Sequence, residues 1–175
     1  MITCPACGFD RNIDGAESCE KCESPLAELA VPKPNSDLER SIFHDRIYAL
    51  SPKKPPVVPP DATVGETLRM MAKNDATDCV LIMRGEELLG IFTERDALWR
   101  INDQADVLAE RPIADYMTPS PQTLEITDKI AFALRYMDQG GFHHLAVRTD
   151  GRVTGIISAP DVMRYITEKL SPAEA

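Results

Sequence analysis

The sequence lacks any apolar run long enough to cross a membrane, since none approaches the roughly 18 consecutive apolar residues that a spanning helix needs. The first residues are polar and include a cysteine, where a secretory signal peptide would be apolar. With 43% hydrophobic and 27% charged residues, the composition is that of a globular protein. We therefore expect a cytoplasmic protein that does not enter a membrane.

Positive charge is also scarce in this chain. It has 19 Lys and Arg against 28 Asp and Glu, which gives a formal net charge of -9 at pH 7. Non-specific affinity for nucleic acid comes largely from cations that neutralise phosphates, so this balance disfavours a nucleic-acid partner. This balance does not exclude a local basic patch.

The motifs of the common catalytic classes are missing. The chain has no nucleophile elbow, no glycine-rich phosphate loop with a lysine, and no HExxH motif. A cysteine-rich segment and a pair of repeats, described below, occupy almost its whole length and leave no room for a separate catalytic domain. We therefore expect that the protein is not an enzyme.

Cysteine is concentrated at the N-terminus, in two CxxC pairs formed by Cys4, Cys7, Cys19 and Cys22. Four thiolates complete a tetrahedral shell, and a segment with so few apolar residues needs a metal to fold. We predict a structural zinc ribbon over residues 1–30. The first pair, in the sequence CPACG, also resembles a rubredoxin knuckle, so iron is the alternative. A disulfide pair is disfavoured without an oxidising compartment.

Residues 31–45 are expected to join this ribbon to the rest of the chain. Residues 31–37 are polar and interrupted by proline, which suits an extended linker. Ser36 and Glu39 then form a capping-box pattern in front of apolar residues at helical spacing. This pattern predicts a lead-in helix over about 37–48.

The remaining sequence is a tandem repeat. GIFTERD at residues 90–96 and GIISAPD at residues 155–161 share the pattern Gly-hydrophobic-hydrophobic-Thr/Ser-x-x-Asp. In each copy this pattern follows an amphipathic helix and two strands joined by a glycine-containing turn, and a second helix follows it. Each copy is therefore predicted to be a β-α-β-β-α unit, the first over residues 46–108 and the second over 109–172.

Two further features of the copies match. Their openings, Leu50-Ser51-Pro52 and Met117-Thr118-Pro119, have similar sequences. Their second helices are expected to bury equivalent apolar faces, which consist of Ala97, Leu98 and Ile101 in the first copy and of Val162, Met163 and Ile166 in the second.

We call Thr93–Asp96 the first signature loop and Ser158–Asp161 the second signature loop. A carboxylate offers two acceptor oxygens, which suits a vicinal diol, and a helix start presents free N–H groups to an anion. The same spacing also forms helix capping boxes, which contribute about 1 kcal/mol each. Both interpretations can hold at once.

The duplicated pattern after a β-α-β-β unit resembles the cystathionine-β-synthase (CBS) domain pair, or Bateman module. The resemblance covers about residues 46–170 and includes both signature loops and the Met117-Thr118 opening. It implies an α+β fold in which two β-α-β-β-α units pack through a pseudo-two-fold, here behind a small N-terminal zinc ribbon. It also implies dimerisation through helix faces, so we expect a homodimer.

The resemblance further implies that an adenosyl ligand such as AMP, ADP, ATP or S-adenosylmethionine binds in the clefts between the units and has a regulatory effect. By position, Asp96 and Asp161 would accept the ribose hydroxyls, and Thr93 and Ser158 would meet phosphate or ribose. The residues that would line the base and phosphate pockets are Val58, Ser51, Thr118, Asp78, Cys79, His143 and His144.

Several of these residues have a plainer explanation. Cys79 lies in an apolar strand and is also explained as a packed core thiol. His143 and His144 are adjacent, so only one can face a cleft if both lie on a strand. Arg95 occupies the first loop where Pro160 occupies the second. We hypothesise that Arg95 donates to a phosphorylated ligand, and the alternative is an exposed arginine at a helix start.

Three functions remain open at this stage. The first is a ligand-sensing regulatory protein that acts on an unidentified protein partner. The second is an interaction adapter with unoccupied clefts that makes its contacts through the zinc ribbon. The third is a small iron protein in which the paired domains regulate electron transfer.

Overall fold

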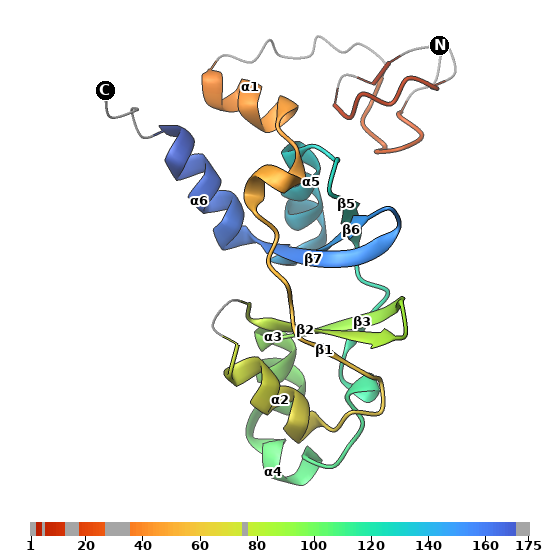
Figure 1. Cartoon of the computed structure of the whole chain (residues 1–175), viewed down its shortest axis with the longest axis vertical. Coiled ribbons are helices and arrows are strands. Elements are labelled where there is room, and N and C mark those ends of the chain that lie inside the picture. The colour runs from red at the N-terminus through yellow and green to blue at the C-terminus, as the bar shows by residue number, and fades with distance from the viewer. Residues whose placement is uncertain (1–2, 5, 13–17, 27–35, 75–76, 171–175) are drawn as a thin grey trace. The chain divides into compact units, whose positions relative to one another are not determined.

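The computed structural model of the chain describes residues 3–4, 6–12, 18–26, 36–74 and 77–170 (Figure 1). The chain divides into two compact units. The first unit comprises the described residues within Met1–Ser51, Ile126–His143 and Ser158–Ala175, and the second comprises those within Pro52–Glu125 and His144–Ile157. The linker predicted over residues 31–37 lies largely outside the described residues. None of the helices in the described part is both long and apolar enough to cross a bilayer.

The strands form two sheets. The first has the order β1-β2-β3-β4 and consists of β1 (Val57–Val58), β2 (Cys79–Arg84), β3 (Glu87–Thr93) and β4 (Thr118–Pro119). The second has the order β5-β6-β7 and consists of β5 (Thr123–Glu125), β6 (His144–Thr149) and β7 (Arg152–Ser158). Each sheet begins with a parallel pair, β1 with β2 or β5 with β6. The mixed α+β fold is as the sequence predicts.

Tight turns join the consecutive strands β2–β3 and β6–β7. Gly85 has φ +62° in the first turn, and Asp150 and Gly151 have φ +52° and +78° in the second. Two successive residues with positive φ are typical of the turn whose twist matches that of a hairpin, and Asp-Gly tolerates this conformation best. The glycine-containing turns predicted from the sequence are therefore confirmed.

Strand β2 is apolar along its buried part because both of its faces are covered. Val80 and Ile82 belong to a core cluster that includes residues of the helical layer, such as Val64. The alternate residues Cys79 and Leu81 belong to a second cluster, which includes Ile156 from the other sheet. The two sheets thus pack face to face within the second unit.

Short helices cover the first sheet: α2 (Val64–Ala72), α3 (Glu94–Asp96), the π-helical turn η2 (Ala97–Ile101), η3 (Asn102–Gln104), α4 (Ala105–Leu108) and η4 (Ile113–Asp115). The predicted capping box at α2 is confirmed. The Thr63 backbone N–H donates to Glu66 Oε2, and the Glu66 N–H donates to Thr63 Oγ1, both at 3.1 Å.

The prediction of equivalent buried faces on the second helices is wrong for two residues. Ile101 and Val162 are buried, but Leu98 is 68% exposed and Met163 is 59% exposed. Each follows directly after a residue that faces the core, so the turn of the helix points its side chain in a different direction from that residue.

The first unit contains α1 (Asp37–His44), η1 (Ile47–Leu50), α5 (Ile130–Gly140) and α6 (Ala159–Leu170), and α5 packs against α6 (Figure 1). The lead-in helix ends earlier than predicted, because Asp45 is extended and its carbonyl accepts a hydrogen bond from the Ile130 N–H at 3.1 Å. The Asp45 carboxylate accepts a 2.7 Å hydrogen bond from Tyr165 Oη and lies 3.0 Å from Lys169 Nζ. These contacts join the end of α1 to α6.

Candidate functional site

The first signature loop connects β3 to α3. Asp96 Oδ2 accepts hydrogen bonds from the Thr93 backbone N–H at 3.0 Å and from the Thr93 hydroxyl at 2.8 Å. The Asp96 N–H in turn lies 3.4 Å from Thr93 Oγ1, which completes a capping box. Asp96 is only 8% exposed, so its carboxylate is held in one orientation at the helix start.

The other oxygen of Asp96 contacts the opening of the second copy. The Thr118 hydroxyl donates to Oδ1 at 3.0 Å, and Arg100 Nε lies 3.4 Å from the same oxygen. Arg100 Nη1 also donates to the carbonyl oxygens of Tyr116 (2.9 Å) and Met117 (2.6 Å). The structure thus brings two predicted residues, the loop acid and the opening threonine, into one network and adds an arginine that the sequence analysis missed.

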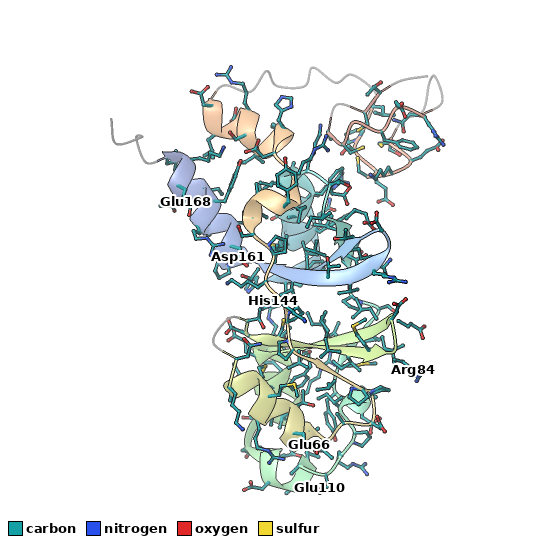
Figure 2. The ribbon with its side chains drawn as sticks, viewed as in Figure 1. Glu66, Arg84, Glu110, His144, Asp161 and Glu168 are labelled. Atoms are coloured by element: carbon teal, nitrogen blue, oxygen red, sulfur yellow. The ribbon has the colours of Figure 1, made fainter. Side chains whose placement is uncertain are left out.

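The second signature loop repeats this arrangement at the start of α6, where Asp161 lies (Figure 2). Asp161 Oδ2 accepts hydrogen bonds from the Ser158 N–H at 2.8 Å and from its hydroxyl at 2.7 Å. Arg164 Nη2 lies 3.2 Å from Asp161 Oδ1 and donates to the Leu50 carbonyl at 3.3 Å. Leu50 belongs to the opening of the first copy.

The contacts of the two loops are therefore reciprocal. Each loop holds its acid in place, and each acid is paired with an arginine that binds backbone carbonyls in the opening of the other copy. The arginines stand four residues after Asp96 and three residues after Asp161. A cation at either spacing after an acid in a helix is the signal by which the sequence could have indicated them.

The glycines that begin the two signature patterns are explained by close approach to the same openings. A Cβ at Gly90 would lie 2.3 Å from Met117 Sδ and 3.0 Å from the Thr118 carbonyl oxygen. A Cβ at Gly155 would lie 2.9 Å from Pro52 Cβ. Backbone pairing accompanies both approaches, because Gly90 pairs with β4 and the neighbour of Gly155 forms a bridge with Lys53.

The residues directly before β2 and β6, Asp78 and His143, form backbone hydrogen bonds with the signature loops. The Asp78 carbonyl accepts a hydrogen bond from the Glu94 N–H at 3.1 Å, and the His143 carbonyl accepts one from the Ala159 N–H at 2.9 Å. Both side chains are exposed. The structure thus places these two candidates beside the loops, at equivalent positions in the two copies.

The Cys79 side chain lies in the core cluster between the sheets and is fully buried. Burial raises the pKa of its thiol to about 12, and a hydrogen bond with Thr77 only partly opposes this shift. This thiol is therefore inert at neutral pH, as the core interpretation of the sequence expects.

The remaining candidates are more dispersed. Val58 is buried in the cluster between the first sheet and its helices. Ser51 follows η1 with φ +54° and is exposed, as is Arg95 in the first loop. His144 is half-buried at the start of β6 (Figure 2). The ligand-binding roles of these residues stay predictions.

A cavity of about 1050 Å³ lies between β1 and α2. Its lining includes the apolar side chains of Val57 and Met70 and the cations Arg69 and Lys73. Of the candidate residues, only Val58 lines it. The cavity is therefore distinct from the first signature loop, to which the sequence assigns the ligand chemistry.

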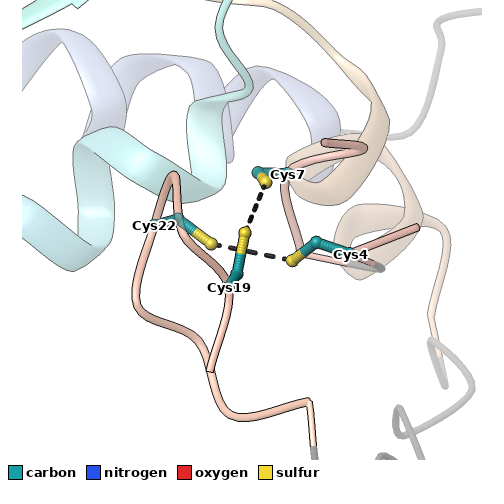
Figure 3. Close-up of side chains that lie close together, drawn as sticks. All are labelled: Cys4, Cys7, Cys19 and Cys22. Atoms are coloured by element: carbon teal, nitrogen blue, oxygen red, sulfur yellow. Dashed lines mark hydrogen bonds between the residues drawn. The ribbon is translucent and has the colours of Figure 1, made fainter. Parts of the chain in front are cut away.

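The four N-terminal cysteines converge (Figure 3). Their sulfur atoms all lie within 4.8 Å of one another, with Cys4 to Cys22 and Cys7 to Cys19 both at 3.6 Å. In a tetrahedral Zn–thiolate site with Zn–S bonds of about 2.3 Å, neighbouring sulfurs are about 3.8 Å apart. The donor set and its spacing therefore fit a single tetrahedral ion.

Burial and close spacing disfavour the thiolate form of these cysteines unless a cation is bound. Burial raises the pKa of the Cys4 and Cys7 thiols above their ordinary value. Burial also acts to raise that of Cys19, but hydrogen bonds from the Lys21 and Cys22 backbone N–H groups and from neighbouring thiols lower its pKa to about 7. Four thiolates so close together would repel one another without a bound cation, and a metal removes this penalty.

The CBS-domain family model matches residues 47–103 and 113–168. An uncharacterised 17.7 kDa protein of Acidianus ambivalens is 27% identical over 124 residues, which cover 70% of this chain and 74% of that protein. The CBS domain-containing protein CBSCBSPB1 of Arabidopsis thaliana is 31% identical over 117 residues, which cover 67% of this chain but only 21% of the plant protein.

Among solved structures, a CBS domain protein of Pyrobaculum aerophilum, PAE2072, complexed with AMP, has a TM-score of 0.61 and 25% identity. The match covers 73% of this chain and 99% of that one. The family matches begin after the cysteine segment. In the second match, the sheet β5-β6-β7 lies almost wholly in one compact unit, whereas α5 and α6 lie in the other.

Proposed function

This chain belongs to the CBS-domain family, and on that premise we propose that it is a regulatory protein whose signature loops bind an adenosyl nucleotide. CBS-domain proteins are generally regulatory or signalling proteins, so we infer that the output is a change in an unidentified protein partner and not a chemical reaction. The AMP complex of the Pyrobaculum protein supports the choice of ligand class.

The observation that carries the proposal is the duplicated, buried carboxylate at a helix start. Capping uses mainly Oδ2 of Asp96, whereas Oδ1 bonds a threonine and an arginine from outside the loop. Because Thr118 and Arg100 already contact Oδ1, a ligand hydroxyl would bind this oxygen by replacing one of them, without disturbing the capping bonds to Oδ2. The capping role and the ligand role are therefore compatible.

The same geometry provides a route to regulation. A ribose hydroxyl that bonds Asp96 Oδ1 would compete with Thr118 and Arg100, which tie this acid to the opening of the second copy. Ligand binding would then favour one arrangement of the opening over another, which is the differential interaction that a population shift requires. In the second loop, a ligand on Asp161 would act in the same way on the opening of the first copy, because Arg164 joins Asp161 to Leu50.

A thermal-shift panel of AMP, ADP, ATP and S-adenosylmethionine tests the ligand. A ligand at 100 times its dissociation constant should stabilise the protein by about 2.7 kcal/mol. We expect Asp96→Asn or Asp161→Asn to reduce this shift, and Glu66→Gln, which changes a capping-box acid outside the signature loops, to leave it unchanged. If no compound shifts the midpoint, the adapter function replaces the sensor.

Arg95 supplies a charge in the first loop that the second loop lacks. We expect Arg95→Ala to weaken ATP binding more than adenosine binding, because only ATP offers phosphate to the guanidinium. Calorimetric titration with both compounds measures the difference, and an equal change for the two would remove Arg95 from the phosphate site.

The cysteine cluster supports zinc as a structural ion, with iron as the alternative. Elemental analysis of protein purified without added metal distinguishes them, and a visible absorption band would favour the redox function. The cytoplasmic location remains a prediction from the lack of a long apolar run and of an apolar signal peptide in the sequence. The homodimer remains one as well, supported by the exposed apolar side chains of Leu98, Trp99 and Val107 on the helical face of the second unit.

A further inference from the structure

The second CxxC pair has an outer shell that reaches beyond the cysteine segment. Ser24 Oγ lies 3.3 Å from Cys22 Sγ and accepts a 2.6 Å hydrogen bond from Arg135 Nη1. The Ser24 carbonyl also accepts from the Cys19 N–H at 2.7 Å, so this serine is fixed to both cysteines of the pair. Arg135 comes from α5 of the second CBS domain.

Two more contacts join the cysteine segment to the residues that precede α5. Lys21 Nζ lies 3.3 Å from Asp128 Oδ1, and the Asp128 side chain is only 14% exposed. Gly8, which follows the first CxxC pair, lies near Lys129, whose Nζ would be 3.9 Å from a Cβ at that glycine. The second CxxC pair thus contacts the segment Asp128–Arg135 through Lys21 and Ser24, and Gly8, next to the first pair, lies near Lys129 of the same segment.

The charges on this segment suit a metal-loaded cluster. Four thiolates around one divalent cation carry a net charge of -2, which Arg135 would approach through Ser24, while Lys129 lies near the Gly8 that follows Cys7. An N–H donor acting through a hydroxyl on a ligand thiolate is the kind of outer-shell contact that orients the ligand and stabilises its charge.

The metal also determines whether these contacts can form. Among the described residues 3–4, 6–12 and 18–26, the buried apolar side chains are the four cysteines themselves, so we expect the folding of this segment to depend on the ion. Without the ion, only local hydrogen bonds such as that from the Cys19 N–H to the Ser24 carbonyl would hold Ser24 and Lys21 at the spacing that Arg135 and Asp128 require.

We infer that the cysteine segment docks on α5 only when it holds a metal ion, and that Arg135 is a positioning residue of the metal centre through Ser24. This inference rests on the proposed metal site. Because α5 packs against α6, which begins at the second signature loop, docking connects the metal state of the segment to the domain that carries Asp161. The docked and released states of the segment are the two states that such coupling needs.

Hydrogen exchange by mass spectrometry, with metal content measured on the same samples, tests this docking. In the full-length protein as purified, we expect slow exchange in peptides that cover residues 126–140, and at least tenfold faster exchange after the metal is removed with a chelator. Arg135→Met should retain one metal ion per chain, bind it about tenfold more weakly, and exchange fast in these peptides without chelation. Arg84→Met, an exposed arginine at the end of β2, is the matched control and should behave as the wild type.

Ser24→Ala provides an independent variant that leaves α5 itself unchanged, and we expect the same phenotype in weaker form. A loaded protein whose exchange over 126–140 does not respond to the chelator or to either variant would overturn the docking while leaving the metal site intact. A protein that contains no metal at any stage would overturn the metal site first, and the inference with it.

Discussion

At the scale of single residues, a few charged side chains hold segments together that are far apart in the chain. Asp45 is the clearest case, because its carboxylate joins the end of α1 to two residues of α6. The hydrogen bond from Tyr165 lowers the pKa of this carboxyl. Lys169 also lowers it, and partial burial acts to raise it. Burial and the same hydrogen bond raise the pKa of Tyr165.

This lowered pKa predicts a pH-dependent contribution to stability. Because the pKa is lower in the folded than in the unfolded state, where it is about 3.9, the contribution is present at neutral pH and is lost as the pH falls below about 4. We expect Asp45→Asn to reduce the free energy of unfolding by about 1 kcal/mol at pH 7, a value that allows for solvent screening.

Urea unfolding at pH 7 and at pH 3 measures this effect. The difference between Asp45→Asn and the wild type should shrink at the lower pH, whereas Asp37→Asn, whose side chain is 95% exposed, should show little difference at either. A deficit of Asp45→Asn that stays constant with pH would contradict the assignment.

At the scale of secondary-structure elements, the openings explain why the signature patterns begin with glycine. Gly90→Ala would place a Cβ against Met117, and Gly155→Ala would place one against Pro52. We expect each substitution to reduce the free energy of unfolding by about 1–3 kcal/mol, as overpacking typically does.

Denaturant titration of the two variants tests this. Gly85→Asn is a suitable control, since this glycine has open space around it and asparagine tolerates its positive φ better than other residues. Its cost should be well below that of either alanine variant, and equal costs at all three positions would remove the close approach as the explanation.

The sequence predicted the elements that depend on local chemistry, and it missed those that depend on tertiary contacts. The capping box of Thr63 and Glu66 and the Asp150-Gly151 turn were both readable, because each is encoded within a few residues. The early end of α1 at His44 and strand β4 were not, because each depends on partners far along the chain. Arg100 and Arg164 were missed for the same reason, since their carbonyl partners come from the openings.

At the scale of the whole molecule, the chain combines a pair of CBS domains with a four-cysteine cluster that the family match does not include. In the proposed account, the signature loops receive a nucleotide and the cysteine segment receives a metal ion. The cysteine segment contacts the second CBS domain through Arg135, so in this account that domain would respond to both signals.

The central claim is that Asp96 and Asp161 receive the vicinal hydroxyls of a ribose. The most direct test is calorimetric titration of the wild-type protein with AMP and with 2′-deoxy-AMP, which differ by one of these hydroxyls. A hydrogen bond to a charged group contributes about 1.5–3 kcal/mol, so the account predicts that the deoxy compound binds roughly 10- to 150-fold more weakly. Equal affinity for the two nucleotides, or no binding of AMP, would contradict it.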